Sequence, residues 1–213
     1  MTDIKTLIAA TENVPYYKEY EAPDINFGEL YRYSGIPVAT DTSEMSEIKE
    51  LAAEAIRLCE GALTYRVAYS LFRLDEEDEL MNMFRSSKDL MTNLKGCDIG
   101  VIFAATVGAG IDRMIRRYKS ARPAMSLMLQ AYGAERAESL CNTFNEDINA
   151  AAVEAGYKTH PRYSPGFGDL PIKVQPLFLD KLNAAKRLGI TLGDSYLMSP
   201  SKSVTAVIGF KKV

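Results

Sequence analysis

One apolar stripe dominates the sequence between residues 134 and 155. Eight side chains recur there at intervals of three and four, the period of a single helix face: Ala137, Leu140, Cys141, Phe144, Ile148, Ala151, Ala152 and Ala155. Gly156 follows at once, and a glycine in this position ends many helices. The pattern therefore predicts a long amphipathic helix, with Glu138 at the edge of its apolar face.

Three other segments have the patterns of strands. Residues 63–71 alternate between larger apolar side chains and small or polar ones, which predicts a half-buried strand. The run 99–105 is continuously apolar and predicts a central strand. Residues 195–210 are typical of two strands joined around Pro200.

Further helices are expected between these strands. Asp41-Thr42-Ser43-Glu44 resembles a capping box, and behind it apolar residues at helical spacing continue to about Gly61. Caps, prolines and glycines predict other helices at 87–94, from about 111, from about 123 and at 176–189. Because helices and strands do not alternate regularly, we predict an α+β fold, with a largely antiparallel twisted sheet flanked by helices. With no repeat or linker, residues 1–213 are expected to form a single domain.

Charge and hydropathy exclude several classes of function. The 25 basic and 28 acidic residues are interspersed and give a net charge of -3, so no basic footprint for nucleic acid is present. No stretch approaches the roughly 20 apolar residues of a membrane span, and the first five residues do not resemble the start of a targeting segment. We expect a cytoplasmic protein with no nucleic-acid or membrane partner.

The residues that commonly carry catalysis are scarce. The chain has one histidine, His160, and three cysteines that lie far apart in apolar sequence: Cys59, Cys97 and Cys141. This set predicts buried thiols, no metal site and no histidine-based catalytic triad. We therefore predict no catalytic side chain, and expect that any chemistry belongs to a bound cofactor.

The loop from Arg162 to Asp169 is the best candidate for a binding site. It concentrates a cation, two aromatic rings, an acid and two glycines between two predicted helices. The planar guanidinium of arginine matches a carboxylate in a bidentate way, and glycine lets a ligand approach the backbone. The alternative is a structured loop in which Arg162 pairs with a nearby carboxylate.

Several short motifs of the chain occur in the same order in the activation domain of vitamin B12-dependent methionine synthase. Arg162-x-x-Pro165-Gly166-Phe167 resembles the Arg-x-x-Pro-Gly-Tyr motif of that family. Met-Ser-Pro-Ser-Lys-Ser-Val-Thr at 198–205 is similar to its Met-x-Pro-x-x-Ser-Val-Ser strand and turn. Upstream, 104–113 resembles its Ala-Thr-Leu-Gly turn and helix, and Ala137-Glu138 with Asn145-Glu146 fits its long helix.

The resemblance covers residues 97–210 well and the first 96 residues only loosely. It implies an antiparallel sheet flanked by helices that binds S-adenosylmethionine in a shallow groove. It also implies that Arg162 holds the methionyl carboxylate and Glu138 the α-ammonium group. The adenosine portion is expected on the backbone of Ser164, Pro165, Gly166 and Phe167. Phe167 replaces a tyrosine of the family, which keeps a stacking surface and removes a hydroxyl.

The resemblance further implies a role in corrinoid-dependent methyl transfer. In the related domain, cobalamin that has left its cycle as Co(II) is reduced and then methylated by S-adenosylmethionine, so the protein has only to place the reactants. No corrinoid-binding or homocysteine-binding motif is present, so the cobalamin is expected to come from a partner. We expect an accessory subunit of a methyltransferase in methionine biosynthesis. Its partners would be a corrinoid-binding protein or a methionine synthase lacking this domain, and a flavodoxin or other low-potential electron donor.

The alternative is a non-catalytic binding or assembly module for a corrinoid protein that has lost S-adenosylmethionine binding. The family's ligand-contacting tyrosine after the last strand has no counterpart before Val213, which favours this alternative. Retention of Arg162, Gly166 and Glu138 favours the methyl-transfer role.

Two further features each allow a functional and a structural interpretation. Gly108-Ala109-Gly110, between a strand and a helix, could bind phosphate at the helix N-terminus or be a plain turn. A basic cluster could dock an acidic partner such as a flavodoxin or be a solvated helix face. That cluster comprises Arg113, Arg116, Arg117, Lys119 and Arg122.

Overall fold

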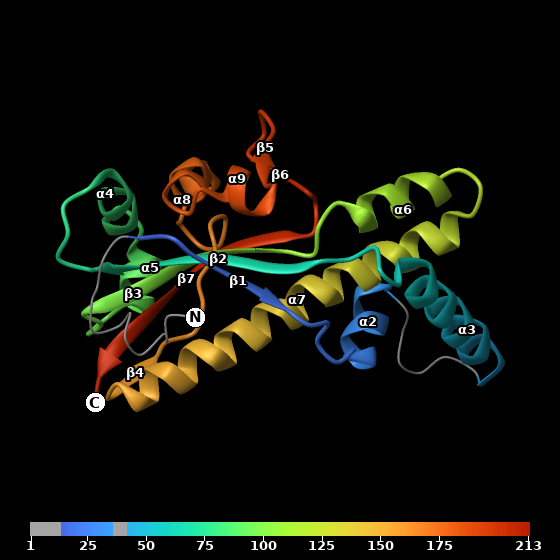
Figure 1. Cartoon of the computed structure of the whole chain (residues 1–213), viewed down its shortest axis with the longest axis horizontal. Helices are drawn as coiled ribbons and strands as arrows, with labels where there is room; N and C mark the ends of the chain where they lie inside the picture. Colours follow the sequence, from blue (N-terminus) through green and yellow to red (C-terminus); the bar gives the residue numbers. More distant parts are fainter. Residues whose placement is uncertain (1–13, 36–41) are drawn as a thin grey trace.

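The fold is built on a five-stranded antiparallel sheet (Figure 1). The computed structural model describes residues 14–35 and 42–213, without the side chains of residues 42–44. The strands stand in the order β1 (Tyr16–Tyr20), β2 (Tyr65–Arg73), β3 (Ile99–Thr106), β7 (Ser203–Lys212) and β4 (Tyr157–Thr159). A separate two-stranded sheet contains β5 (Thr191–Leu192) and β6 (Met198–Ser199). The predicted α+β class with an antiparallel sheet is confirmed.

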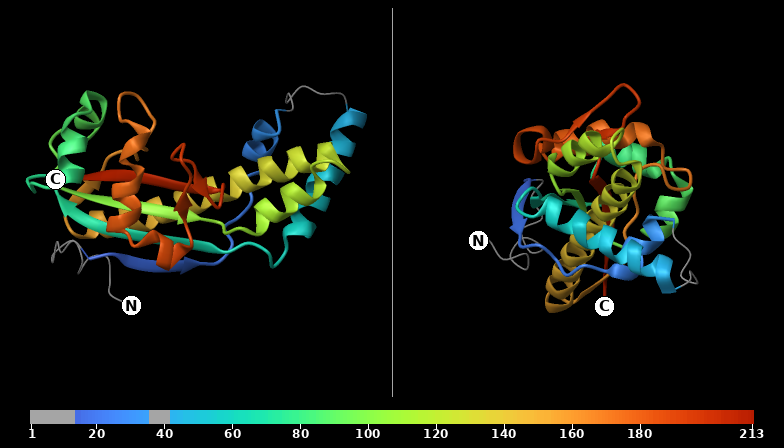
Figure 2. Two further views of the ribbon diagram at one scale, coloured as in Figure 1. Left: turned by 90° about the horizontal axis from the view of Figure 1, so that it is seen from above. Right: turned by 90° about the vertical axis from the view of Figure 1, so that its right-hand side faces the viewer.

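Helices cover both faces of the sheet (Figures 1 and 2). One face packs against α7 (Pro123–Glu154), and α2 (Phe27–Tyr33), α3 (Thr42–Cys59) and α6 (Gly110–Tyr118) pack in turn against α7. The other packs against α4 (Glu79–Arg85), α5 (Lys88–Asn93), the 3-10 turn η1 (Ile172–Val174), α8 (Gln175–Lys181) and α9 (Ala184–Leu188). All eight residues of β3 are buried, which explains its unbroken apolar run.

Burial on both faces corrects the prediction for the strand that became β2. Its larger side chains, such as Val67 and Leu71, face α7, as the alternation indicates. Ala68 and Phe72 are not exposed, because they pack into the second helical layer. The alternating side chains of β2 therefore pack into two different helical layers, and neither face of the strand is solvated. The strand β1 was not predicted.

The long predicted helix is longer in the structure. Residues from 123 onward and the stripe at 134–155 form one helix, α7, of 32 residues, which is about 48 Å long. Pro123 stands in its first turn, where the missing N–H costs nothing. Gly133 allows a close crossing, since a Cβ there would lie 2.8 Å from Ile111 and 3.0 Å from Lys202.

The helix predicted at 176–189 is divided into two. α8 ends at Lys181 and α9 begins at Ala184, with Asn183 between them in the left-handed region at φ 49°. Asparagine adopts that conformation at little cost, and it lets the chain change direction. The side chains of the predicted capping box at 41–44 and the N-terminal residues 1–5 lie outside the described part of the chain.

All three cysteines are buried and unpaired, as predicted. Burial raises the pKa of Cys59 to about 11 and that of Cys141 to about 12. Both thiols are therefore protonated near neutral pH and fill the core. Among the described residues, none of the helices has the length and apolar character needed to cross a membrane. The same residues contain no cluster of three or more potential metal ligands.

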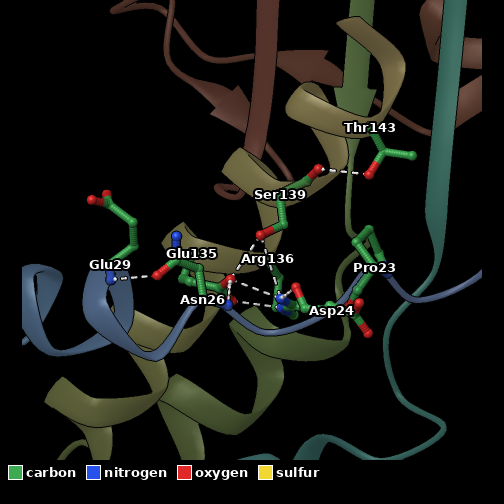
Figure 3. Close-up of polar contacts among 8 residues, drawn as sticks. All are labelled: Pro23, Asp24, Asn26, Glu29, Glu135, Arg136, Ser139 and Thr143. Atoms are coloured by element: carbon green, nitrogen blue, oxygen red, sulfur yellow. Dashed lines mark hydrogen bonds and ion pairs between the residues drawn. The ribbon is translucent and has the colours of Figure 1, made fainter. Parts of the chain in front are cut away.

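A buried ion pair fastens the N-terminal segment to α7 (Figure 3). Glu135 and Arg136 are 0% and 1% exposed. Arg136 donates to both carboxylate oxygens of Glu135, at 2.6 and 2.7 Å, and to the backbone carbonyls of Pro23 and Asp24. The backbone N–H of Asn26 donates to Glu135 at 2.9 Å. Residues 23–26 thus supply the hydrogen bonds that make this buried charge pair tolerable.

We expect Arg136→Met to lower the free energy of unfolding by about 3 to 5 kcal/mol, because the Glu135 carboxylate would stay buried without its partner. Urea unfolding followed by circular dichroism measures this change. Arg32→Met is the matched control, since it removes an arginine from an exposed pair with Glu29 that solvent already screens. Equal destabilisation by the two substitutions would contradict the importance of the buried pair.

Candidate functional site

The segment after β4 runs alongside β7 and sets the direction of Arg162. The backbone N–H of His160 donates to Gly209 at 2.9 Å, and Tyr163 exchanges two backbone hydrogen bonds of 2.8 Å with Val207. Adjacent residues of an extended chain point to opposite sides. Tyr163 packs against the core between the sheet and α8, so its neighbour Arg162 points toward α7.

Arg162 meets the polar face of α7. Its guanidinium forms an ion pair with Glu138 and donates to the Asn142 side chain at 3.1 Å. With its amide oriented to satisfy both ends, Asn145 also accepts from Arg162, at 3.3 Å. The side chains of Arg162 and Glu138 are 21% and 33% exposed. The structure therefore brings together the two residues predicted to hold opposite ends of an amino acid, at a surface that a ligand can reach.

The remaining predicted site residues form a tight turn. Phe167 N–H donates to Ser164 at 3.1 Å, and Gly166 N–H donates to Leu170 at 2.9 Å. Gly166 has a φ of 90°, which a side chain would oppose. Pro165 is buried. The Phe167 ring is 66% exposed and is thus available to a flat partner.

Asp169 joins this turn to α5. Its carboxylate accepts from the Ser87 hydroxyl and from the backbone N–H groups of Lys88 and Asp89, at 2.8 and 3.2 Å. Asp89 in return accepts from the backbone of Asp169 at 3.2 Å. Hydrogen bonds from Ser87, and then from the backbone, lower the pKa of Asp169. The acid of the predicted site loop therefore caps a helix and holds the loop in place.

A polar groove of about 350 Å³ lies beside Arg162. Its lining comprises Asn145, Glu146, Asn149, Thr159, His160, Pro161, Arg162 and Ile208. His160 Nδ1 contacts the Asn93 carbonyl, which can only accept, so Nδ1 is the donor in this contact. Sequence reasoning named Asn145 only as part of the long-helix motif and missed Asn142 and Asn149, although the spacing of the three asparagines after Glu138 places all four residues on one helix face.

A larger cavity lies elsewhere. About 610 Å³ in volume, it is bounded by α3 and α7, with Ile56, Leu63, Tyr65 and Tyr132 among its lining residues. Its lining is mainly hydrophobic, and it contains none of the predicted site residues. We place the candidate site at Arg162 because polar groups of α7 and of residues 159–162 converge there beside β7. Convergent polar groups indicate a binding site better than cavity size alone does.

The turn Gly108-Ala109-Gly110 has a structural explanation. A Cβ at Gly110 would lie 1.9 Å from the carbonyl oxygen of Ala62, and one at Gly108 would lie 2.6 Å from the Thr64 hydroxyl. Gly108 also has a φ of 79°. Both glycines are needed for close contact between this turn and residues 62–64, which supports the plain-turn interpretation over phosphate binding.

Comparisons with known proteins place the fold. No protein-family model matches the chain, and no protein of curated function matches its sequence significantly. Among solved structures, the chain is similar to the crystal structure of the MetH reactivation domain bound to AdoHcy, with a TM-score of 0.66 and 15% sequence identity. The match covers 92% of this chain and 78% of the other. The chain therefore has the reactivation-domain fold that its motifs predict.

Acid should weaken the hydrogen bonds that hold the site loop to α5. Because folding lowers the pKa of Asp169, its stabilising hydrogen bonds are complete above the unfolded value of about 4 and are lost as pH falls through the lower folded value. We expect Asp169→Asn to remove this pH dependence and to speed amide hydrogen exchange at Lys88 and Asp89 near neutral pH. Hydrogen exchange measured by NMR tests this prediction. Unchanged protection of the Lys88 and Asp89 amides in Asp169→Asn would contradict it.

Proposed function

We propose that this chain binds S-adenosylmethionine and helps to reactivate a corrinoid methyltransferase of the methionine synthase kind. The contact between Arg162 and Glu138 is the observation that carries the proposal. It presents a positive and a negative group side by side on the surface. The similar reactivation domain of MetH is bound to AdoHcy, which supports a ligand of the same class here.

An α-amino acid fits this pair because it carries both of its charges on one carbon. Its carboxylate can take the planar guanidinium of Arg162 while its ammonium meets Glu138, so each charge in the protein exchanges one partner for another. Asn142, which already accepts from Arg162 at 3.1 Å, keeps the guanidinium oriented during this exchange. The ligand thus meets a prepared site without leaving a charge unpaired.

The turn after Arg162 would carry the adenosine portion. The N–H groups of Gly166 and Phe167 are used within the turn, so contacts from this backbone fall to the carbonyl groups. Carbonyls accept hydrogen bonds, and the adenine amino group donates them. The exposed ring of Phe167 adds a stacking surface beside Ser164, Pro165 and Gly166.

The side chains of this site have to position a methyl donor rather than transfer protons. A reduced cobalamin carried by a partner would supply the nucleophile for the sulfonium methyl group, and Arg162 and Glu138 would hold the methyl donor in place. Arg162 and Glu138 hold the amino-acid end, and the turn holds the nucleoside end, which leaves the methyl group between them. Such a reaction needs no general base from the protein.

Two partners complete the proposal. The corrinoid would be carried by a corrinoid-binding protein or by a methionine synthase that lacks this domain, and electrons would come from a flavodoxin or another low-potential donor. The chain would then be an accessory subunit of the methyltransferase. The alternative, a binding or assembly module without methyl transfer, is favoured by Phe167, because it lacks the hydroxyl of the family's tyrosine.

We expect Arg162→Ala to weaken binding of S-adenosylmethionine by about 2 to 4 kcal/mol, since a charge-assisted pair is lost and the ligand carboxylate is left unpaired. Arg162→Lys should recover only part of this, because an ammonium group cannot reproduce the planar fork. Isothermal titration calorimetry measures both, with Arg187→Ala on the exposed part of α9 as the control. Unchanged affinity in Arg162→Ala would contradict the proposal that Arg162 binds the carboxylate of S-adenosylmethionine.

Mixed with a Co(II) corrinoid protein, a low-potential electron donor and S-adenosylmethionine, the chain should accelerate formation of methylcobalamin. Absorption spectroscopy follows the cobalt, and the acceleration should vanish when S-adenosylmethionine is omitted. Glu138→Gln keeps the shape and removes the charge, so methylation should slow mainly through weaker binding of the methyl donor. If S-adenosylmethionine binds but the cobalt spectrum does not change, the methyl-transfer role is contradicted and the non-catalytic binding module is favoured.

A further inference from the structure

A second charged surface lies on α6, remote from Arg162. We define the α6 patch as Arg113, Arg116, Arg117 and Lys119, all of which are exposed. Four cations within seven residues stand out in a chain with a net charge of -3. In Figure 1, α6 lies at the end of the molecule opposite to β4 and the C-terminus.

Within the described part of the chain, no carboxylate pairs with the α6 patch. Arg122, the fifth member of the basic cluster, forms a two-pronged pair with Glu54 at 2.5 and 2.8 Å and is thereby neutralised. The acid of α6 itself, Asp112, accepts from the backbone and hydroxyl of Ser201. Arg117 lies 5.9 Å from the Tyr118 ring, a contact that leaves its charge in place.

The helix that carries this patch is firmly anchored. Ile111 and Ile115 of α6 are buried in the core that α7 shares. Ser126 of α7 donates to the carbonyl of Ile115 at 3.2 Å, and Gly110 makes its close approach to Ala62. The four cations are therefore presented on a rigid platform, which lowers the entropy cost of binding a partner.

Helix stability alone does not account for the whole patch. Arg116 and Arg117 lie in the last turn, where cations favour the helix dipole. Arg113 lies in the first half of the helix, where the dipole gives it no such benefit. It also stands four residues before Arg117, a spacing at which like charges repel by a few tenths of a kcal/mol. A binding partner explains the cluster better than the helix does.

We propose that the α6 patch binds an acidic surface of a partner protein. The nine residues of α6 span only about 13 Å, which is short for a track along a nucleic-acid backbone, and the rest of the chain is net acidic.

This surface is independent of the proposed ligand site. Ser126, which contacts α6, and Glu138, which pairs with Arg162, are twelve residues apart on α7, or about 18 Å along the helix. A protein docked on α6 therefore leaves the Arg162 site free. The inference does not rest on S-adenosylmethionine binding, and its test needs no ligand.

The test uses a fluorescent polyglutamate peptide of about 20 residues as the probe, and anisotropy to measure binding at several salt concentrations. We expect the double variant Arg113→Glu, Arg117→Glu to lose at least about tenfold in affinity and to show a weaker dependence on salt. The double variant Lys186→Glu, Arg187→Glu on α9 is the matched control. It makes the same change of charge at exposed positions and should bind like the unaltered chain.

Two results would overturn the proposal: no binding of the unaltered chain at low salt, or equal losses in both double variants, which would indicate attraction to overall charge. Tighter binding of a DNA duplex of similar length, lost in the same α6 variant, would assign the patch to nucleic acid instead. Should the glutamate variant fold poorly by circular dichroism, Arg113→Ala with Arg117→Ala replaces it. That variant should lose a smaller part of the affinity, and no loss would equally count against the patch.

Discussion

The burial of Glu135 and Arg136 in the middle of α7 is the constraint to which the rest of the structure is fitted. Two charges at 0% and 1% exposure are tolerable only when their remaining hydrogen bonds are satisfied. The carbonyls of Pro23 and Asp24 and the N–H of Asn26 satisfy them, so the segment before α2 must lie against α7. This contact leads the chain from β1 at the sheet edge into α2.

Different faces of α7 make three different sets of contacts. Its apolar face is buried against the sheet, one flank holds the ion pair, and another carries Glu138, Asn142 and Asn145 toward the segment after β4. The bridge between Tyr163 and Val207 holds that segment to the sheet. Arg162 is thus positioned by rigid elements on both sides, which is how a binding site keeps its geometry without a ligand.

The arginines of this chain differ more in their surroundings than in their chemistry. Arg136 is enclosed, Arg162 is paired but reachable, and Arg122 is neutralised at the surface. Arg113, only nine positions before Arg122, pairs with no carboxylate in the described part of the chain. Net charge and residue type do not separate these roles, because each depends on which carboxylate the fold brings within reach.

The sequence by itself determined the antiparallel α+β class, the buried strand β3 and the main part of α7, since these follow from local periodicity. Its motifs also identified the turn around Gly166. Only the tertiary structure decided that β2 is covered on both faces and that Arg162 meets Glu138, 24 residues away. Layers and ion pairs of this kind depend on how distant segments pack, and local patterns carry no information about the side chain that lies opposite.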